Sequence, residues 1–398
     1  MHQNGISGRY WPQIILLWLM GLLAAAQLGK MSALLPILRE EYGLTLAEAG
    51  WIASLLEAGG AVLGLLAGLL IGRLGNRQGL GFGLLLLAAA GIGEGFAPDA
   101  SALVALRLAE AAGYVLIVIA APSMIATVAP PAARGAAFAL WSTFVPAGLA
   151  IGVAVTGAML AVLPMSGIFL AWGLLAVIVA AGWFALPGAP RPAVARLVFP
   201  GLPVWLLTAG FGCFTLAEVG MLAMLPTYLI EETGLASAAA GIFAGVASLA
   251  TMAGSFAAGW ALSRLYGRNA FLRLAATGLL VAAIFTLAVF TFSAEIGGLH
   301  PAWLAAAAAI LANAFVGLYP AVAFTRLPDL VAGPEGLASA NGVLAQFGAG
   351  GAMVGPPLAG FVASLWGWPA VSPMLAGCFV AALVLSILAE HVSVPAVK

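Results

Sequence analysis

Charge is what this sequence lacks most. Charged residues make up 7% of the 398 residues, whereas hydrophobic residues make up 64%. A soluble domain of this length needs far more charge to cover its surface, so the composition excludes a water-soluble fold. The formal net charge is zero, which leaves no basic surface for a nucleic acid, and we expect no nucleic-acid partner.

Cysteine, histidine and phosphate-binding loops are also scarce or absent. The chain has two cysteines and three histidines, and Cys213 and Cys378 lie far apart in apolar runs. We expect both cysteines to be packing residues, with no disulfide and no metal site. The sequence has no Gly-x-x-x-x-Gly-Lys-Ser/Thr motif, which argues against ATP-driven transport. We therefore expect no catalytic residues, no cofactor and no enzyme activity.

Long apolar runs are what the chain has instead. Its mean hydropathy is +1.13, and its apolar runs are about 20 residues long, enough to cross ~30 Å of hydrocarbon. Helices satisfy their own backbone hydrogen bonds in lipid. We predict an all-α membrane protein with twelve transmembrane helices in two six-helix pseudo-symmetric halves. The predicted spans are 12–38, 45–72, 79–97, 100–129, 135–163, 166–187, 201–230, 236–265, 270–293, 300–327, 335–364 and 368–390.

A short basic motif appears twice, each time after a long apolar run. Residues 68–77 read GLLIGRLGNR, and residues 259–268, 191 positions later, read GWALSRLYGR. A shift of about half the chain indicates a duplicated bundle, in which a substrate site lies between the halves. A proline-rich stretch separates them. The expected domains are an N-terminal bundle at 1–187, a cytoplasmic linker at 188–200 and a C-terminal bundle at 201–398.

The basic residues predict the orientation of the chain in the membrane. Arginine and lysine concentrate in cytoplasmic loops, and with the N-terminus inside, only Arg39 falls clearly outside. We therefore expect both termini in the cytoplasm of a bacterium, with the chain spanning its plasma (inner) membrane. The residues placed inside are Arg9, Arg73, Arg77, Arg134, Arg191, Arg196, Arg264, Arg268, Arg273, Arg326 and Lys398.

Twelve spans in two halves, with a Gly-x-x-x-x-Arg-x-Gly-x-Arg turn after the second span, resemble the major facilitator superfamily. The resemblance implies secondary transport and a cytoplasmic gate at this turn. The family's pattern usually has Asp before the first Arg, where this chain has Gly72 and Ser263, so the gate's charge clamp is altered or missing. These arginines can still bind the C-terminal carbonyls of helices or lipid phosphates. The gate residues are Arg73, Arg77, Arg264 and Arg268.

Two further stretches resemble parts of the same superfamily. The stretch 107–146 resembles small bacterial permeases of the cyanate/nitrate type and of organic anions. Residues 351–360 read GAMVGPPLAG, and Gly-Pro patterns of this kind, in the fifth span, are associated with antiporters of the superfamily. Here the sharper copy lies in the eleventh span. Close helix packing through small residues, with a proline bend, explains it as well.

Lys30 and Glu218 are the charges on which the functional interpretation depends most. An ionised side chain deep in a bilayer costs ~2.5–3.5 kcal/mol on insertion scales, so it needs a partner, a wet cavity or a role. The repeat places the two residues at similar depth in spans 1 and 7, which face the central cavity in the superfamily. We expect them to face each other, Lys30 binding substrate and Glu218 carrying the coupling proton. A structural ion pair between the halves is the alternative.

Three ionisable side chains follow each other in span 4. Arg107 and Glu110 are three residues apart and share a helix face. Arg107 is a candidate substrate ligand and Glu110 a candidate proton carrier, unless the two form a local structural pair. Tyr114, one turn further on, extends the same polar face.

The depths of two further carboxylates indicate opposite roles for them. Glu57 lies near the middle of span 2 and is a candidate proton carrier, unless a partner such as Lys30 holds it. Glu94 lies close to the outer end of span 3, where we expect it to reach water.

Three amides complete the candidate site. Gln27 lies one turn before Lys30, Asn313 within span 10 and Gln346 within span 11. Each is a candidate substrate ligand, and each can equally bond a neighbouring helix.

The sequence therefore predicts a secondary active transporter that moves a small organic or inorganic anion by alternating access, coupled to a proton. Proton-driven multidrug efflux is the alternative, although a central lysine argues against a carrier of lipophilic cations. A membrane-embedded enzyme or receptor is disfavoured by the repeat. We expect a monomer in a lipid bilayer that binds a small-molecule substrate and a proton, and whose Lys30→Ala variant folds but takes up no anion.

Overall fold

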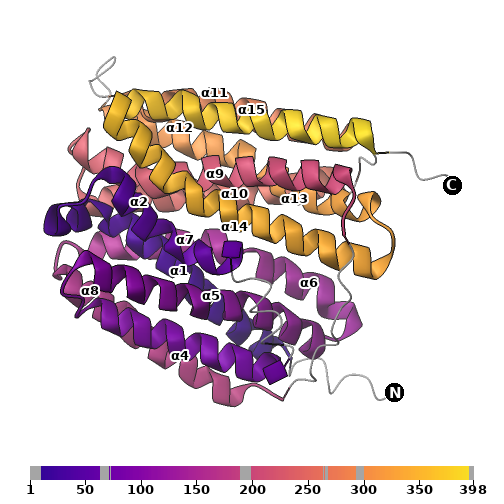
Figure 1. The fold of residues 1–398 in the computed structure, drawn as a ribbon, viewed down its shortest axis with the longest axis horizontal. Coiled ribbons are helices and arrows are strands. Elements are labelled where there is room, and N and C mark those ends of the chain that lie inside the picture. Colours follow the sequence, from indigo (N-terminus) through magenta and orange to yellow (C-terminus); the bar gives the residue numbers. More distant parts are fainter. Residues whose placement is uncertain are drawn as a thin grey trace.

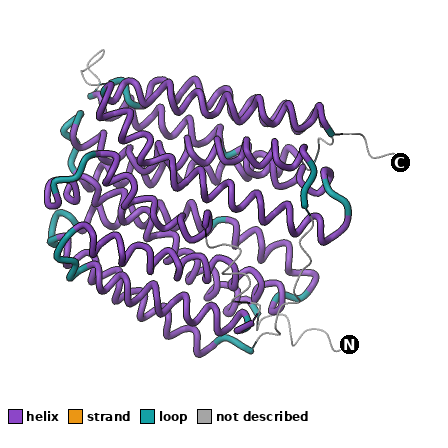
Figure 2. The backbone as a smooth tube through the Cα atoms, viewed as in Figure 1, coloured by secondary structure: helices purple, strands orange, loops and turns teal. Residues whose placement is uncertain are grey.

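The computed structural model describes residues 10–62, 71, 73–188, 199–262, 264, 268–292 and 300–393. Within these residues the chain forms helices and connecting loops, with no strand (Figure 2). Ten of the described helical segments are long and apolar enough to cross a membrane. The helix of residues 76–94 and the interrupted helix that begins at residue 46 complete the twelve spans.

The first half runs through six spans and ends before the predicted linker, most of which lies outside the described residues. Its elements are α1 (Trp11–Tyr42), α2 (Leu46–Ser54) with the 3-10 turn η1 (Leu55–Glu57), α4 (Asn76–Glu94), α5 (Ala100–Val128), α6 (Pro131–Ser142), α7 (Phe144–Met159), and α8 (Met165–Ala181) with η2 (Gly182–Ala185).

The second half repeats this plan. Its elements are α9 (Leu202–Glu231), α10 (Ser237–Leu262), α11 (Arg268–Val289), α12 (Pro301–Val316), α13 (Leu318–Arg326) with the 3-10 turn η3 (Leu327–Leu330), α14 (Gly333–Trp366) and α15 (Trp368–Val392). Equivalent helices pack alike, because α1 lies against α7 as α9 lies against α14.

The helices begin and end where the predicted spans do, within a few residues. The internal interruptions at η1, between α6 and α7, and between α12 and α13 were not predicted. The start of α1 and the end of α15 lie at the same end of the molecule, on the right in Figure 1. We call this the termini end and the opposite one the far end.

Polar side chains cap the helices at the far end. Thr45 and Glu48 form a capping box at the start of α2. Asp99 accepts the Ala102 backbone N–H at 2.8 Å and the Ser101 hydroxyl at 2.6 Å, and these two bonds lower the pKa of Asp99. These caps fix where the chain turns back into the membrane.

Glycines let α1 and α7 touch backbone to backbone. A Cβ added to Gly152 would lie 2.1 Å from the Ala26 carbonyl oxygen, and one added to Gly29 would lie 2.2 Å from that of Leu149. Because hydrophobic burial gives no driving force between helices in lipid, such close contact supplies the packing energy.

The two halves meet chiefly through two helix pairs, α2 with α14 and α7 with α10, and α1 also contacts α9. Along the first pair, Gly360 approaches the Leu46 carbonyl, Gly50 approaches Pro357, and the Gln346 amide donates to the Ala61 carbonyl at 3.0 Å. This path leads from the far end towards the middle of α14, so the halves are joined in the far half of the membrane.

The second pair follows the same course. The Ser237 hydroxyl donates to the Gly157 carbonyl at 3.3 Å near the far end, and the Ser248 hydroxyl donates to the Pro146 carbonyl at 3.0 Å deeper in the membrane. Beyond this point Gly254 of α10 packs on Ala314 of its own half. Among the described residues, the hydrogen bonds and closest glycine contacts between the halves lie between the far end and about the middle of the helices.

Candidate functional site

Four charged side chains form one closed cluster inside the first half. Lys30 Nζ of α1 lies 2.5 Å from Glu94 Oε2 of α4 and 3.3 Å from Glu110 Oε1 of α5. Arg107 pairs with Glu110 one turn away on α5, and its Nη1 lies 3.8 Å from Glu94 Oε1. All four side chains are fully buried. Two positive and two negative groups neutralise each other, which is how charge is tolerated at this depth.

Neighbouring elements hold the cluster in place. Arg107 donates through Nε to the Ile52 carbonyl at 3.3 Å and through Nη2 to the Ala53 carbonyl at 3.2 Å. Both carbonyls precede the 3-10 turn η1, where the regular α-helical hydrogen bonding of α2 ends. Lys30 also lies 5.2 Å from the ring centre of Phe169 in α8. The expected pairing of Arg107 with Glu110 is thus present, within a larger network.

The structure corrects three expectations about these charges. Lys30 and Glu218 do not face each other, because Lys30 turns into its own half towards Glu94 and Glu110. Lys30 is likewise no partner of Glu57. Glu94 does not reach water as a surface group, since 2% of it is exposed. The α4 helix ends at Glu94, three residues before the predicted end at 97, which places this side chain within the bundle.

Glu57 lies apart from the cluster, at the interruption of the second span. It is the last residue of η1 and is half-buried, and among the described residues it has no hydrogen bond or ion pair. The turn η1 packs against α5 and against α14 of the other half. Tyr114 of α5 lies near enough to interact electrostatically with Glu57. The predicted extension of the Arg107–Glu110 face by Tyr114 stays a prediction.

Glu218 belongs to a polar chain across three helices of the second half. Thr251 of α10 places its hydroxyl 3.0 Å from Glu218 Oε1 of α9 and 3.3 Å from Asn313 Oδ1 of α12. The Asn313 amide donates to the Ala309 carbonyl at 2.8 Å, which fixes its oxygen towards Thr251. Glu218 is half-buried. The sequence analysis did not single out Thr251. This residue lies in α10, the counterpart of the second span, and the repeat gives no signal for a functional polar group there.

The break between α12 and α13 lies directly against this polar chain. A Cβ on Gly317 would lie 2.1 Å from the Thr251 carbonyl oxygen, so only glycine fits this contact. The Ser255 hydroxyl donates to the Gly317 carbonyl at 2.8 Å. Thr251 thus contacts Glu218 with its side chain and the helix break with its backbone.

The two glutamines bond to backbone carbonyls. Gln27 is buried and donates to the Leu23 carbonyl at 3.2 Å, while its Oε1 has no partner among the described residues. Gln346 is exposed and bridges to Ala61 of the other half. A substrate role for either stays a prediction.

The paired basic turns lie at the termini end and contact their own halves. Arg77 donates to the Leu186 carbonyl at 3.0 Å, as a helix C-terminus favours, and stacks 3.9 Å over Trp183. Arg268 lies 3.6 Å from Glu390, which also binds Arg326 at 2.7 Å. Arg264, just after α10, lies 4.1 Å from the ring centre of Trp260 at the end of that helix, and Arg73 is exposed. Gly72 and Ser263 lie outside the described residues, and the gate role of these arginines stays a prediction.

Comparison with known proteins decides the family. The family model described as Major Facilitator Superfamily matches residues 17–294, more than half of the chain. The chain belongs to the Major Facilitator Superfamily. It is therefore a multi-pass membrane transporter of the secondary type and not an enzyme.

Curated relatives of this superfamily member match over short segments. The lincomycin resistance protein of Streptomyces lincolnensis is 28% identical over 116 residues, 29% of this chain and 24% of its own length. The galactose-proton symporter of Escherichia coli K12 is 26% identical over 131 residues, 33% of this chain and 28% of its own length. The chain thus spans about a quarter of the length of these relatives. The resemblance to anion permeases stays a prediction.

Solved structures match over nearly the whole chain. A bacterial homolog of the human lysosomal transporter Spinster, in an inward-facing and occupied conformation, superposes with a TM-score of 0.74. The identity is 18%, covering 96% of this chain and 95% of that one. The unoccupied inward-facing form of such a homolog gives 0.71 at 17% identity, covering 97% and 96%. At these identities the likeness shows the fold alone.

Proposed function

We propose that this transporter couples the movement of a cationic, partly apolar small molecule to that of a proton. One observation carries the proposal. Deep in the membrane, the described cations Lys30 and Arg107 are both neutralised inside a buried cluster, while the carboxylates Glu57 and Glu218 are partly exposed outside it. A partly exposed carboxylate attracts a cation, and protons compete with that cation for the carboxylate.

This conclusion departs from the anion expected from the sequence. That expectation depended on a central Lys30, and Lys30 has two carboxylate partners within 3.3 Å. The same lysine was the argument against multidrug efflux, so its burial removes that argument. A small anion remains a prediction that the experiment below tests directly.

The Glu218 chain supplies a means for the protein to respond to protonation. The Thr251 hydroxyl has one proton and faces two acceptor oxygens. When Glu218 is ionised, Thr251 donates to it. When Glu218 is protonated, its own O–H donates to Thr251, and the Thr251 proton turns to Asn313. The protonation state of α9 is thereby transmitted to α12, beside the helix break at Gly317.

The position of Glu57 supports a shared pathway between the halves. Gly50 and Gly60, seven residues before and three residues after it, both approach α14 of the other half. These spacings put Glu57 on the stripe of the second span that faces α14. A group at this interface changes its surroundings when the halves rock against each other, as alternating access requires.

Sidedness follows from the charges. Among the described residues, the termini end carries Arg77, Arg264 and Arg268, and the far end carries Arg39. By the positive-inside rule we place both termini in the cytoplasm of a bacterium and the chain in its inner membrane, as a monomer. With this orientation the far end faces outward, and the contacts between the halves close the outer side of the transporter. The halves 1–187 and 201–398 are the two bodies that move against each other during transport.

A thermal-shift experiment on the purified protein tests the proposal. Tetraphenylphosphonium, galactose and benzoate stand for cationic, neutral and anionic ligands, since a bound ligand raises the melting temperature by mass action. We expect stabilisation by tetraphenylphosphonium that weakens as the pH falls and is reduced in Glu57→Gln and Glu218→Gln. Stabilisation by benzoate that disappears in Lys30→Met would establish an anion carrier and overturn the proposal.

A further inference from the structure

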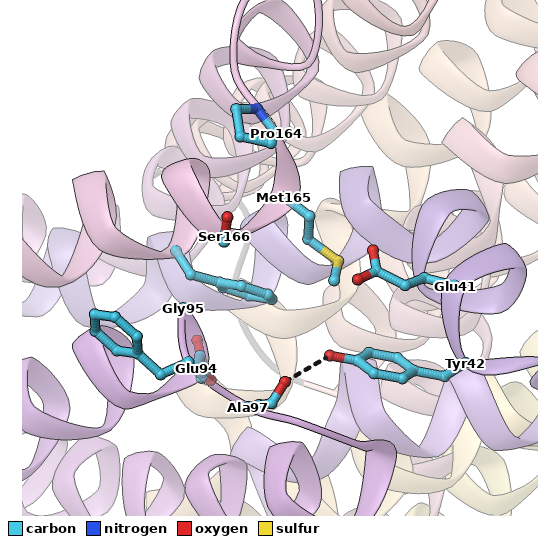
Figure 3. A pocket seen from close by; sticks show the side chains of 10 residues that line it. Glu41, Tyr42, Glu94, Gly95, Ala97, Pro164, Met165 and Ser166 are labelled. Atoms are coloured by element: carbon cyan, nitrogen blue, oxygen red, sulfur yellow. Dashed lines mark hydrogen bonds between the residues drawn. The ribbon is translucent and has the colours of Figure 1, made fainter.

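A crevice at the far end leads to the buried charge cluster of the first half. Its volume is about 330 Å³, and it lies between the end of α1, the end of α4 and the start of α8. Glu41 and Ser166 line its exposed mouth, while Glu94 and Phe169 line its buried part. Figure 3 shows Glu41 and Tyr42 on one side and Met165 and Ser166 across from them, with Glu94 and Ala97 beside the space.

Glu94, one of the residues that line this crevice, has a buried side-chain oxygen without a partner among the described residues. Its Oε2 is bound by Lys30, whereas its Oε1 is buried and has no hydrogen bond among the described residues. Arg107 Nη1 lies 3.8 Å from Oε1, beyond hydrogen-bond distance. A buried carboxylate oxygen needs a donor, and water is the donor that a crevice of this size admits.

The lining of the crevice suits water. The Glu41 carboxylate, the Ser166 hydroxyl and the Tyr42 hydroxyl all border it, and Tyr42 donates to the Ala97 carbonyl at 3.3 Å. This is enough polar surface for water molecules to form their two to four bonds each. The crevice therefore brings water from the far side up to the residues that cover the Glu94 carboxylate, which itself has no exposed surface.

We propose that this crevice is a proton entry site, through which protons from the far side reach Glu94. The proposal rests on the proton coupling proposed above and adds a second, separate proton site in the first half. The ligand is a proton and not a metal ion, because Lys30 already occupies one oxygen of Glu94 and the cluster is neutral without a further cation.

The chemistry at Glu94 balances without any other reactant. Hydronium transfers a proton to the carboxylate, leaving water and a carboxylic acid, and the cluster changes from neutral to a charge of plus one. Lys30 then turns to Glu110, whose Oε1 is already 3.3 Å away. The charged and titratable groups around Glu94 are Lys30, Glu41 and Tyr42 from α1 and Arg107 and Glu110 from α5, and the crevice residues of α8 carry none.

The cluster is sealed in every other direction. Its four side chains have no exposed surface, Arg107 is tied to the Ile52 and Ala53 carbonyls, and Phe169 covers Lys30. The α1 helix, which carries Lys30 and packs on both α5 and α7, is the element that protonation would shift.

Infrared difference spectroscopy of the purified protein in nanodiscs, without substrate, tests the proposal. On a pH jump we expect a carboxylic-acid C=O band that Glu94→Gln lacks and Glu218→Gln retains. Ser166→Trp keeps Glu94 but obstructs the crevice, so the band should develop several-fold more slowly. Val162→Trp, an exposed substitution outside the lining, is the matched control.

Two results would overturn the proton entry site. One is a Glu94→Gln protein that keeps the complete pH-jump spectrum. The other is a Ser166→Trp protein that titrates as fast as Val162→Trp, and this comparison decides the question even if Glu94→Gln does not fold. Because no substrate is present, these results are independent of the tetraphenylphosphonium experiment, so either proposal can fail alone.

Discussion

At the scale of single residues, partners decide what each buried charge does. Lys30 and Arg107 are as deep as a substrate ligand should be, yet Glu94 and Glu110 hold both of them. Removing one member leaves an unpaired charge in the bundle, which costs far more than the net contribution of the intact cluster. From the sequence we expect the Lys30→Ala variant to fold normally. With the cluster in view, we expect this variant to be destabilised instead.

Lys30→Met should lower the stability by about 3–5 kcal/mol, the usual cost of breaking a buried pair. The double variant Lys30→Met/Glu94→Gln removes one charge of each sign and leaves Arg107 with Glu110. It should be more stable than Lys30→Met alone in thermal denaturation. Equal or lower stability of the double variant would mean that the cluster does not act as a neutral unit.

Thr251→Val should disconnect Glu218 from Asn313 while preserving shape. We expect the pH at which tetraphenylphosphonium binding is half-lost to move, because the hydroxyl that responds to Glu218 is gone. Thr286→Val is the matched control, since the Thr286 hydroxyl bonds only within its own helix, to Ala282 at 2.7 Å. If the pH dependence of binding in Thr251→Val coincides with that of wild type and of the control, Thr251 does not transmit the protonation state of Glu218 to Asn313.

At the scale of helices, the sequence determines the spans well and their partners poorly. Apolar length and the repeated basic turn predicted twelve spans, because these depend on residues close together in the chain. Whether Lys30 turns towards Glu94 or Glu218 depends on helix rotation, which apolar residues on every side leave undetermined. The break at Glu57 has no proline beside it, so nothing in the local sequence predicts it. At Gly317 the signal is present, because Pro320 lacks the N–H that would bond the carbonyl of Val316.

Gly152→Ala tests the close packing of α1 on α7. The new methyl group would lie 2.1 Å from a backbone oxygen that cannot move aside, so we expect a loss of about 1–3 kcal/mol. Gly167→Ala is the control, because its nearest neighbour would be 3.4 Å away. Thermal denaturation in detergent compares the two, and equal melting temperatures would show that this contact does not limit stability.

At the scale of the whole molecule, the halves are closed at the far end by glycine contacts and one ion pair. Arg39 of α1 and Glu231 of α9 join the tips of the halves. Both side chains are partly exposed, so the pair is worth at most about 1 kcal/mol. The packing of α2 on α14 and of α7 on α10 therefore supplies most of the closure, and the ion pair marks where the halves must separate.

Cross-linking these tips should arrest transport. In a background with Cys213 and Cys378 replaced by alanine, we expect a thiol cross-link in Arg39→Cys/Glu231→Cys to stop proton-driven ethidium transport in inverted membrane vesicles. Reduction of the cross-link should restore it, and Arg39→Cys alone should transport throughout. Unimpaired transport with the cross-link in place would exclude opening at the far end.

The central claim is that the partly exposed carboxylates Glu57 and Glu218, and not the buried cations, bind substrate in exchange for protons. Equilibrium binding of tetraphenylphosphonium to purified protein, with the released protons counted, tests it most directly. We predict that wild type and Lys30→Met/Glu94→Gln bind the cation and release protons, whereas Glu218→Gln releases fewer. Binding that is unchanged in both Glu57→Gln and Glu218→Gln, with no proton release in wild type, would contradict the account.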